Sequence, residues 1–228
     1  MPVDYNKLDN PAWHALTERH SHFATGTRDF KRYDPEIVLF AGFDIQNENA
    51  FKQLNAVVGI NESVFLFDKF PALPHNYSID AFVECLQMIC PSPLLINITE
   101  KIVLLNETHT GEMFALVSTV FPGYYLPHTN RMGSYYGIFK ENKLIAMAGE
   151  RLCMDGLTEV SAVVTHPNFT GRKYAQQLMT HLHQKHLEEG VVSFLHTGSA
   201  NETAIKIYEL LGYERRRLID VRKIRRTT

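Results

Sequence analysis

The apolar residues in the second half of the chain follow two periods, one typical of helices and one typical of strands. Spacings of three and four residues predict helices over residues 110–120, 174–189 and 201–211, and the glycines at positions 190 and 212 are typical helix ends. Runs of β-forming residues predict strands over 102–105, 133–139, 144–153, 159–165 and 191–197, then a β-rich segment from 213. This order predicts an α/β protein with a mixed sheet and helices on its faces.

The first third of the chain has a less regular pattern. Residues 10–32 look partly helical, 37–40 and 64–67 predict strands, and 47–58 predict a helix between them. Residues 79–89 predict a further helix, because their apolar positions share one helical face. The prolines at 91 and 93 would end that helix, since proline cannot continue its hydrogen bonding. We expect a boundary here, between an N-terminal region over 1–97 and a second domain over 98–228.

The composition, with 45% hydrophobic and 21% charged residues, is that of an ordinary globular protein. The formal net charge of −2 argues against a uniformly basic nucleic-acid binder. Residues 214–228 nevertheless carry a net charge of +5. Such a tail leaves a salt-sensitive nucleic-acid partner as an alternative, but a basic final strand with a mobile end is the commoner explanation.

The three cysteines, Cys85, Cys90 and Cys153, cannot all pair with one another, which favours a reducing compartment. The N-terminal residues do not resemble a signal peptide. The most apolar stretch, over 94–105, contains charged residues and is too short to span a bilayer. We therefore expect a cytoplasmic protein without a membrane partner.

The segment that carries chemistry covers residues 159–175 and reads EVSAVVTHPNFTGRKYA. A predicted strand leads into a short loop, and the loop opens a helix whose free N–H groups can bind phosphate. Gly171 allows a ligand to approach the backbone closely, and Arg172 and Lys173 add positive charge. The alternative is an ordinary strand–turn–helix with a solvated basic turn.

A second segment, NETAIKIYELLGY over 201–213, resembles the C-terminal signature of GNAT N-acetyltransferases. The loop from Thr170 to Ala175 is similar to the acetyl-CoA loop of that family, usually Arg/Gln-x-x-Gly-x-Gly/Ala. Thr170 replaces the usual arginine or glutamine, and Lys173 replaces a glycine. The resemblance covers 102–217, and within it the motifs Gly149-Glu150-Arg151, Glu159-Val160-Ser161 and Thr165-His166-Pro167 look most like the branch with a glycine N-acyltransferase-like catalytic domain.

The resemblance implies a GNAT-like fold with a splayed central sheet and acetyl-CoA as the acyl donor. It implies transfer of an acetyl group to a primary amine by direct attack, without a covalent enzyme intermediate. The backbone of the strand before the loop would pair with the pantetheine arm, much as an added strand would. The cofactor-binding residues that it implies are Val163, Val164, Thr165, Thr170, Gly171, Arg172, Lys173, Tyr174, Ala175, Asn201 and Tyr208.

Catalytic roles follow from the same resemblance. Tyr208 matches the tyrosine that faces the coenzyme sulfur and would protonate the departing thiolate, although it could also simply pack the last helix. Glu159 is the candidate general base, with Ser161 and His196 completing a chain through water, and Glu150 is a weaker alternative. Asn201 could also cap the helix that follows it.

Other interpretations remain open at this point. A non-catalytic GNAT-fold module that senses coenzyme or binds protein is the main alternative, and the departures at Thr170 and Lys173 motivate it. His181, His183 and His186 invite a metal site, but a solvated helix face is the expectation, and we predict no metal. The acceptor amine is unidentified, and a homodimer is possible.

Overall fold

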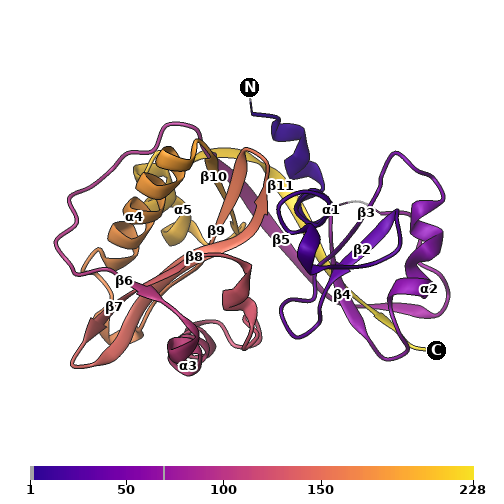
Figure 1. The fold of residues 1–228 in the computed structure, drawn as a ribbon, viewed down its shortest axis with the longest axis horizontal. Helices are drawn as coiled ribbons and strands as arrows, with labels where there is room; N and C mark the ends of the chain where they lie inside the picture. The colour runs from indigo at the N-terminus through magenta and orange to yellow at the C-terminus, as the bar shows by residue number, and fades with distance from the viewer. Residues whose placement is uncertain (1–2, 69) are drawn as a thin grey trace.

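The structure, a computed structural model that describes residues 3–68 and 70–228, is built on one open mixed sheet (Figure 1). In spatial order the strands are β4 (Ser63–Phe67), β11 (Glu214–Arg226), β5 (Tyr77–Cys90), β10 (Val192–Gly198), β9 (Leu157–Thr165), β8 (Lys143–Met154), β7 (Tyr135–Lys140) and β6 (Val103–Leu105). β9 and β10 pair in parallel, and the other neighbours pair antiparallel. The predicted α/β class with a mixed sheet and flanking helices is confirmed.

Helices cover both faces of this sheet. α4 (Tyr174–Glu189) and α5 (Glu202–Leu210) lie on one face and α3 (Thr110–Val120) lies on the other (Figure 1). Leu178 and Leu182 of α4 pack with Met88 of β5 in one core cluster. Met113 of α3 packs with Val164 of β9 in another. The helical periods over 110–120 and 174–189 were therefore predicted correctly, because each has a clear buried stripe.

The helix ends and turns follow from single residues. Gly190 adopts a left-handed conformation (φ 66°) directly after α4, as expected for a glycine helix end. The Asn201 side chain caps α5 by accepting a hydrogen bond from the N–H of Ala204 at 3.2 Å. Glu141 and Asn142 both have positive φ and form the tight turn between β7 and β8.

The N-terminal region forms a smaller lobe beside the sheet. It contains η1 (Tyr5–Asp9), α1 (Pro11–Thr17), η2 (Ser21–Phe23), η3 (Ala50–Gln53), α2 (Leu54–Val57) and a three-stranded sheet of β1 (Ala24–Gly26), β2 (Phe30–Tyr33) and β3 (Ala41–Phe43). A side chain at Gly42 would lie 2.5 Å from the backbone nitrogen of Trp13, so glycine lets α1 pack directly on β3. The helix predicted over 47–58 is confirmed only in part, and the strand predicted over 37–40 is wrong, since Phe40 makes a single bridge to Phe65.

The helix predicted over residues 79–89 is also wrong. This segment belongs to β5, a 14-residue strand that pairs with β10 on one side and with β11 on the other. Near its end both faces are covered, with Leu86 and Met88 in one core cluster and Cys85 and Ile89 against another. Burial on both faces removes the polar–apolar alternation that marks a strand.

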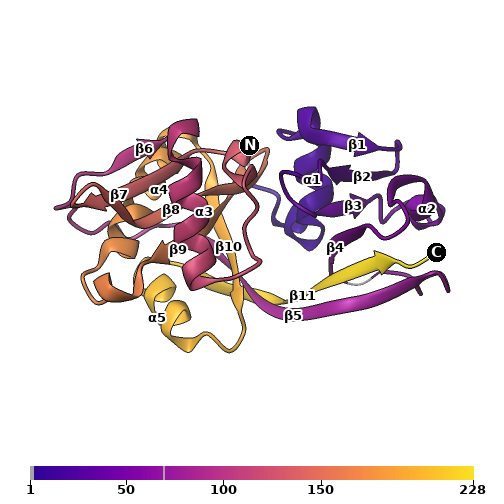
Figure 2. The same ribbon diagram turned by 90° about the horizontal axis from the view of Figure 1, so that it is seen from below.

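β5 and β11 run side by side from the main sheet into the N-terminal lobe (Figure 2). β11 also pairs with β4 there, from Val221 to Arg225. Strands from both sides of residue 97 therefore belong to one sheet. A domain boundary at that residue stays a prediction. The basic final strand expected from the sequence is confirmed, because residues 214–226 form this paired strand. Several of its arginines pair with acids, among them Arg217 with Asp68 and Arg225 with Asp80.

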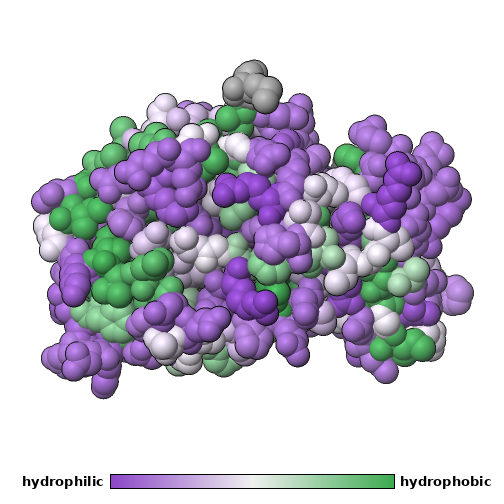
Figure 3. All heavy atoms as spheres, in the orientation of Figure 1, coloured by the Kyte–Doolittle hydropathy of each residue, from purple (hydrophilic) through white to green (hydrophobic). Residues whose placement is uncertain are grey.

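Three further one-turn elements complete the chain: η4 (Glu107–His109), η5 (Thr129–Met132) and η6 (Pro167–Phe169). On the face seen in Figure 3, hydrophobic surface gathers over the side of the sheet formed by β6 and β7. Leu104 of the edge strand β6 is 59% exposed. Within the described ranges, no helix has both the length and the apolar character needed to cross a membrane.

Candidate active site

The parallel strands β9 and β10 separate in the middle of the sheet. Their pairing runs from Val192 opposite Leu157 to Phe194 opposite Glu159, and the rest of β10 continues to pair with β5 as far as Gly198. Just beyond this fork, β9 has a bulge against β8, where Ala162 takes a positive φ of 49°. The splayed sheet that the sequence resemblance implied is present, and Val163, Val164 and Thr165 lie on the diverging part of β9.

The predicted phosphate-binding residues follow this strand directly. The first helical hydrogen bond of α4 runs from the N–H of Gln177 to the carbonyl of Lys173, so the N–H groups of Tyr174 and Ala175 have no partner within the helix. No side chain caps this helix start. Gly171, Arg172 and Lys173 are exposed beside it. Unpartnered N–H groups, the helix dipole and two cations form an arrangement that suits a pyrophosphate.

Lys173, which replaces the glycine of the family's loop, takes a backbone conformation typical of glycine. Lys173 adopts the left-handed conformation with φ 59° and ψ 21°, which glycine adopts at little cost. The loop therefore keeps the backbone shape expected of a glycine while presenting a charged side chain. By contrast, the Tyr174 side chain is buried and the Thr170 hydroxyl donates to the carbonyl of Pro167 at 3.1 Å. The Tyr174 side chain is thus part of the core, and the Thr170 hydroxyl has a partner within the loop although the residue is exposed.

Tyr208 of α5 lies at the margin of the same core cluster as Val163 of β9. Burial raises the pKa of Tyr208 to about 12, with a smaller contribution from the phenol of Tyr124. Its phenol therefore stays protonated at neutral pH and is available as a donor. Tyr124 comes from the segment after α3, on the other face of the sheet from α5.

Glu159 is completely buried (0% exposed), at the fork. Its carboxylate receives two hydrogen bonds from Arg151, at 2.7 and 2.8 Å, and one from His196 Nδ1 at 2.7 Å. Burial by itself would raise the pKa of Glu159, but Arg151 and His196 outweigh it and lower the pKa to about 2. A carboxylate with so low a proton affinity and so many partners is poorly suited to the predicted role of general base.

Tyr124 is a candidate site residue that the sequence analysis missed. Its hydroxyl lies 3.0 Å from the Oγ of Ser161, and the guanidinium of Arg151 lies 5.3 Å from its ring centroid. The Tyr124 side chain is 45% exposed, whereas Ser161 and Arg151 are buried. The predicted water chain is only partly assembled, because Glu159 and His196 meet while Ser161 pairs with Tyr124. No local motif surrounds Tyr124, so only the fold could reveal its position.

Glu150, the weaker alternative base, lies in a different polar cluster. It accepts hydrogen bonds from Lys185 at 2.6 Å and His186 at 2.9 Å. Burial would raise the pKa of Glu150, but these partners and the N–H of Ser134 lower it to about 2. The expectation of a solvated histidine face on α4 is wrong for His186 and His183, which are 1% and 0% exposed. Within the described residues, no three or more His, Cys, Asp or Glu side chains are grouped to hold a metal ion.

Comparison with known proteins assigns this fold to a family. The model of the FR47-like protein family matches residues 135–222. The crystal structure of a GNAT-family protein from Novosphingobium aromaticivorans is 31% identical in sequence, with 97% of this chain and 99% of that chain covered and a TM-score of 0.87. The chain belongs to the GNAT acetyltransferase family. The recognition of the superfamily from the two sequence motifs is therefore confirmed.

More distant solved structures share the fold over most of the chain. A GCN5-related N-acetyltransferase from Kribbella flavida is 15% identical, with 98% and 95% of the two chains covered and a TM-score of 0.59. A Drosophila protein is 12% identical, with 87% and 74% covered and a TM-score of 0.66. None of the curated proteins matches the chain.

Proposed function

We propose that this GNAT protein is an acetyl-CoA-dependent N-acetyltransferase that acts on a primary amine. The observation that carries the proposal is the fork between β9 and β10, followed directly by the uncapped, positively charged start of α4. Acetyl-CoA would place its pyrophosphate at the loop from Thr170 to Ala175. Its pantetheine arm would lie along the diverging backbone of Val163 to Thr165, and Asn201 would contact the coenzyme from the start of α5.

In this arrangement the thioester would lie at the fork, near Tyr208. The amine nitrogen attacks the thioester carbonyl, the C–S bond breaks, and the amine loses a proton as the thiolate gains one. The Tyr208 phenol, whose pKa is raised by burial, stays protonated and donates to the sulfur as negative charge develops there. Its location in the same cluster as Val163 supports this role.

The buried ion pair favours a positioning role for Glu159 over the base role. Glu159 holds Arg151 and His196, and Arg151 in turn lies against the ring of Tyr124. The hydroxyl groups of Ser161 and Tyr124 lie 3.0 Å apart, and we propose that they order the water that receives the amine proton. Two hydroxyls at 3.0 Å can pass a proton without either becoming a strong base.

Within the GNAT family, we propose the branch similar to glycine N-acyltransferases, on the motifs around Glu150, Glu159 and His166. We also propose that the protein works in a reducing, cytoplasmic setting, since Cys85, Cys90 and Cys153 are all free thiols. A primary amine is the acceptor that we propose, because an unprotonated amine can attack a thioester directly.

Calorimetric titration with acetyl-CoA is the first test of this proposal. We expect saturable one-to-one binding, followed by release of free CoA thiol when a panel of primary amines is added. Binding without thiol release from any amine would support the alternative, a coenzyme-sensing module on the GNAT fold. No binding at millimolar acetyl-CoA would contradict both functions.

A further inference from the structure

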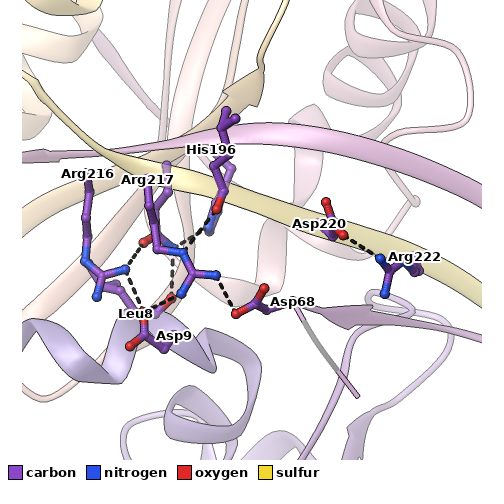
Figure 4. A network of polar contacts seen from close by, with 10 residues as sticks. Leu8, Asp9, Asp68, His196, Arg216, Arg217, Asp220 and Arg222 are labelled. Atoms are coloured by element: carbon purple, nitrogen blue, oxygen red, sulfur yellow. Dashed lines mark hydrogen bonds and ion pairs between the residues drawn. The ribbon is translucent and has the colours of Figure 1, made fainter. Parts of the chain in front are cut away.

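Gln87 of β5 links the N-terminal region to the candidate active site through three polar contacts. Its three partners, Leu8, Arg216 and His196, are labelled in Figure 4. Its side chain is completely buried (0% exposed). Its Oε1 accepts a hydrogen bond from Arg216 at 2.7 Å, and its Nε2 donates to the carbonyl oxygen of Leu8 at 2.8 Å. The same Nε2 lies 2.9 Å from Nε2 of His196. A buried amide with partners on three sides has a defined orientation.

Arg216 and Leu8 determine which end of the Gln87 amide carries the oxygen and which carries the NH₂ group. A guanidinium such as that of Arg216 can only donate, and a carbonyl such as that of Leu8 can only accept. Turning the Gln87 amide over would set NH₂ against the guanidinium and oxygen against the carbonyl, two unfavourable contacts at once. The NH₂ group of Gln87 therefore faces His196.

The state of the His196 ring follows from this orientation. Because Gln87 donates to Nε2, that nitrogen carries no proton, and the ring proton lies on Nδ1. Nδ1 is 2.7 Å from the carboxylate of Glu159, which accepts it. The charged groups around the ring are Glu159 itself, the Arg151 guanidinium paired with it, and Arg216 beyond Gln87. The neighbouring rings of Phe67 and Phe194 carry no charge.

We infer that Gln87 is a positioning residue for acetyl transfer. It holds His196 as the neutral tautomer with its proton on Nδ1, and His196 in turn orients Glu159. Glu159 fixes Arg151, whose guanidinium lies over the ring of Tyr124 at the fork. The kinetic part of this inference rests on the proposed function, whereas the tautomer does not.

The same series of side-chain contacts connects the N-terminal region to the candidate site. Besides Gln87, Arg216 contacts the carboxylate of Asp9 at 2.8 Å, and Asp9 also pairs with Arg217 at 3.0 Å (Figure 4). Leu8 and Asp9 belong to η1, far from β9 in sequence. The side chain of Gln87 therefore transmits the position of η1 to the fork.

Nitrogen NMR of the ¹⁵N-labelled protein tests the tautomer directly. The His196 signals are identified as those lost in the variant His196→Gln. At neutral pH we expect a protonated Nδ1 and an unprotonated Nε2. In Gln87→Glu the amide donor is replaced by a carboxylate, so we expect both ring nitrogens to carry a proton. A protonated Nε2 in the natural protein would overturn the inference.

Gln87→Met keeps the side-chain length and removes the hydrogen bonds, so it tests the positioning role even where Gln87→Glu does not fold. Using acetyl-CoA and the fastest amine from the panel, we expect kcat to fall about tenfold. The KM for acetyl-CoA should change less than about twofold, because the phosphate loop lies outside this chain of contacts. An unchanged kcat would refute the positioning role.

The matched control is Gln177→Met on α4. Gln177 is also buried (5% exposed) and accepts hydrogen bonds from the backbone of Thr99 and Glu100. This variant loses a buried amide elsewhere, so the His196 nitrogen signals should stay unchanged; changed signals would show that they report general loosening. If the natural protein acetylates no amine, the proposed function fails, and the NMR result still decides the tautomer.

Discussion

Phe194 and Glu159 form the last pair between β10 and β9, and the strands separate directly after them. Two residues further along β10, His196 reaches back to the Glu159 carboxylate at 2.7 Å. A side-chain hydrogen bond thus joins the strands at the point where backbone pairing stops. The buried ion pair between Glu159 and Arg151 anchors this junction. The side chains of Glu159, Arg151 and His196 therefore hold the strands together at the fork.

Removal of the charge at this junction should destabilise the protein. Glu159→Gln leaves Arg151 buried without a counter-charge, and loss of one partner of a buried ion pair costs about 3–5 kcal/mol. Urea unfolding should show this loss as a lower midpoint with an unchanged slope. Glu188→Gln, on the exposed side of α4, is the control and should change the unfolding free energy by less than about 0.5 kcal/mol. Equal midpoints for both variants would show that the ion pair contributes little.

The stability of the fold should fall in acid in two steps. Burial lowers the pKa of His20 and His183 to about 4, below the ordinary value of 6.5. Between these values the unfolded chain binds more protons, so stability is lost as the pH falls from about 6.5 to 4. The partners of Glu159 and Glu150 lower the pKa of each carboxyl to about 2. The unfolded chain therefore binds more protons between about pH 4.5 and 2, and stability is lost a second time as the pH falls through this range.

The first of these steps is checked by replacing a single histidine. Between pH 6.5 and 4, the free energy of unfolding should fall less in His183→Gln than in the natural protein. The difference should be up to roughly 3 kcal/mol. His75→Gln is the matched control, because His75 is exposed and its loss should leave the slope unchanged. A slope that is equally steep in both variants would show that burial of His183 is not its source.

Acetyl-CoA affinity should depend on the charge of the loop before α4. The double variant Arg172→Glu, Lys173→Glu places two negative charges beside the predicted pyrophosphate, and we expect Kd to rise about 10- to 100-fold at low salt. Lys52→Glu, an exposed charge reversal in the N-terminal lobe, should leave Kd unchanged. Calorimetry measures both, and equal affinities would move the coenzyme away from this loop.

Lys173→Gly separates charge from backbone shape at the same loop. Glycine adopts the left-handed conformation of residue 173 more easily than lysine, so the folded state should be as stable or slightly more stable. Because one cation is lost, Kd for acetyl-CoA should rise by only about threefold to tenfold. A larger loss than in the double charge reversal would mean that lysine supports the loop in another way.

The sequence predicted the part of the fold that carries a clear period or a recognisable motif. The helices α3 and α4 and the turn at Glu141 and Asn142 follow from local residues, and the GNAT resemblance placed the splayed strand and the loop. β5 could not be predicted in this way. Its strand state depends on β11, which lies more than a hundred residues away, and its apolar spacing fits a helix equally well.

The candidate site divides in the same manner. Gly171, Lys173 and Asn201 could be placed because backbone geometry and capping follow from residue type and local order. The partners of Glu159 could not, since Arg151 and His196 come from two other strands. From the sequence Glu159 is a candidate general base, and only the packing of three strands shows that it is buried and paired.

Tyr208→Phe tests the proposed acid without altering packing. Because the phenol pKa is raised to about 12 by burial, Tyr208 stays protonated across the working range, and kcat should show no alkaline decline from this group below about pH 11. The variant should lower kcat by about 10²–10⁴-fold and leave Kd for acetyl-CoA within about twofold. Tyr5→Phe, in the N-terminal lobe, is the control. An unchanged kcat in Tyr208→Phe would refute the acid role.

Asn201→Ala and Asn201→Ser together distinguish the capping role of Asn201 from its proposed contact with the coenzyme. Asn201→Ala removes the cap on α5 and should lower the free energy of unfolding by about 1 kcal/mol, whereas Asn201→Ser retains a capping oxygen and should lower it by much less. If the amide also contacts the coenzyme, both variants lose that contact and both should raise Kd for acetyl-CoA by about threefold to tenfold. A rise in Kd confined to Asn201→Ala would instead trace the effect to loosening of α5, and Asn201 would then be a capping residue alone.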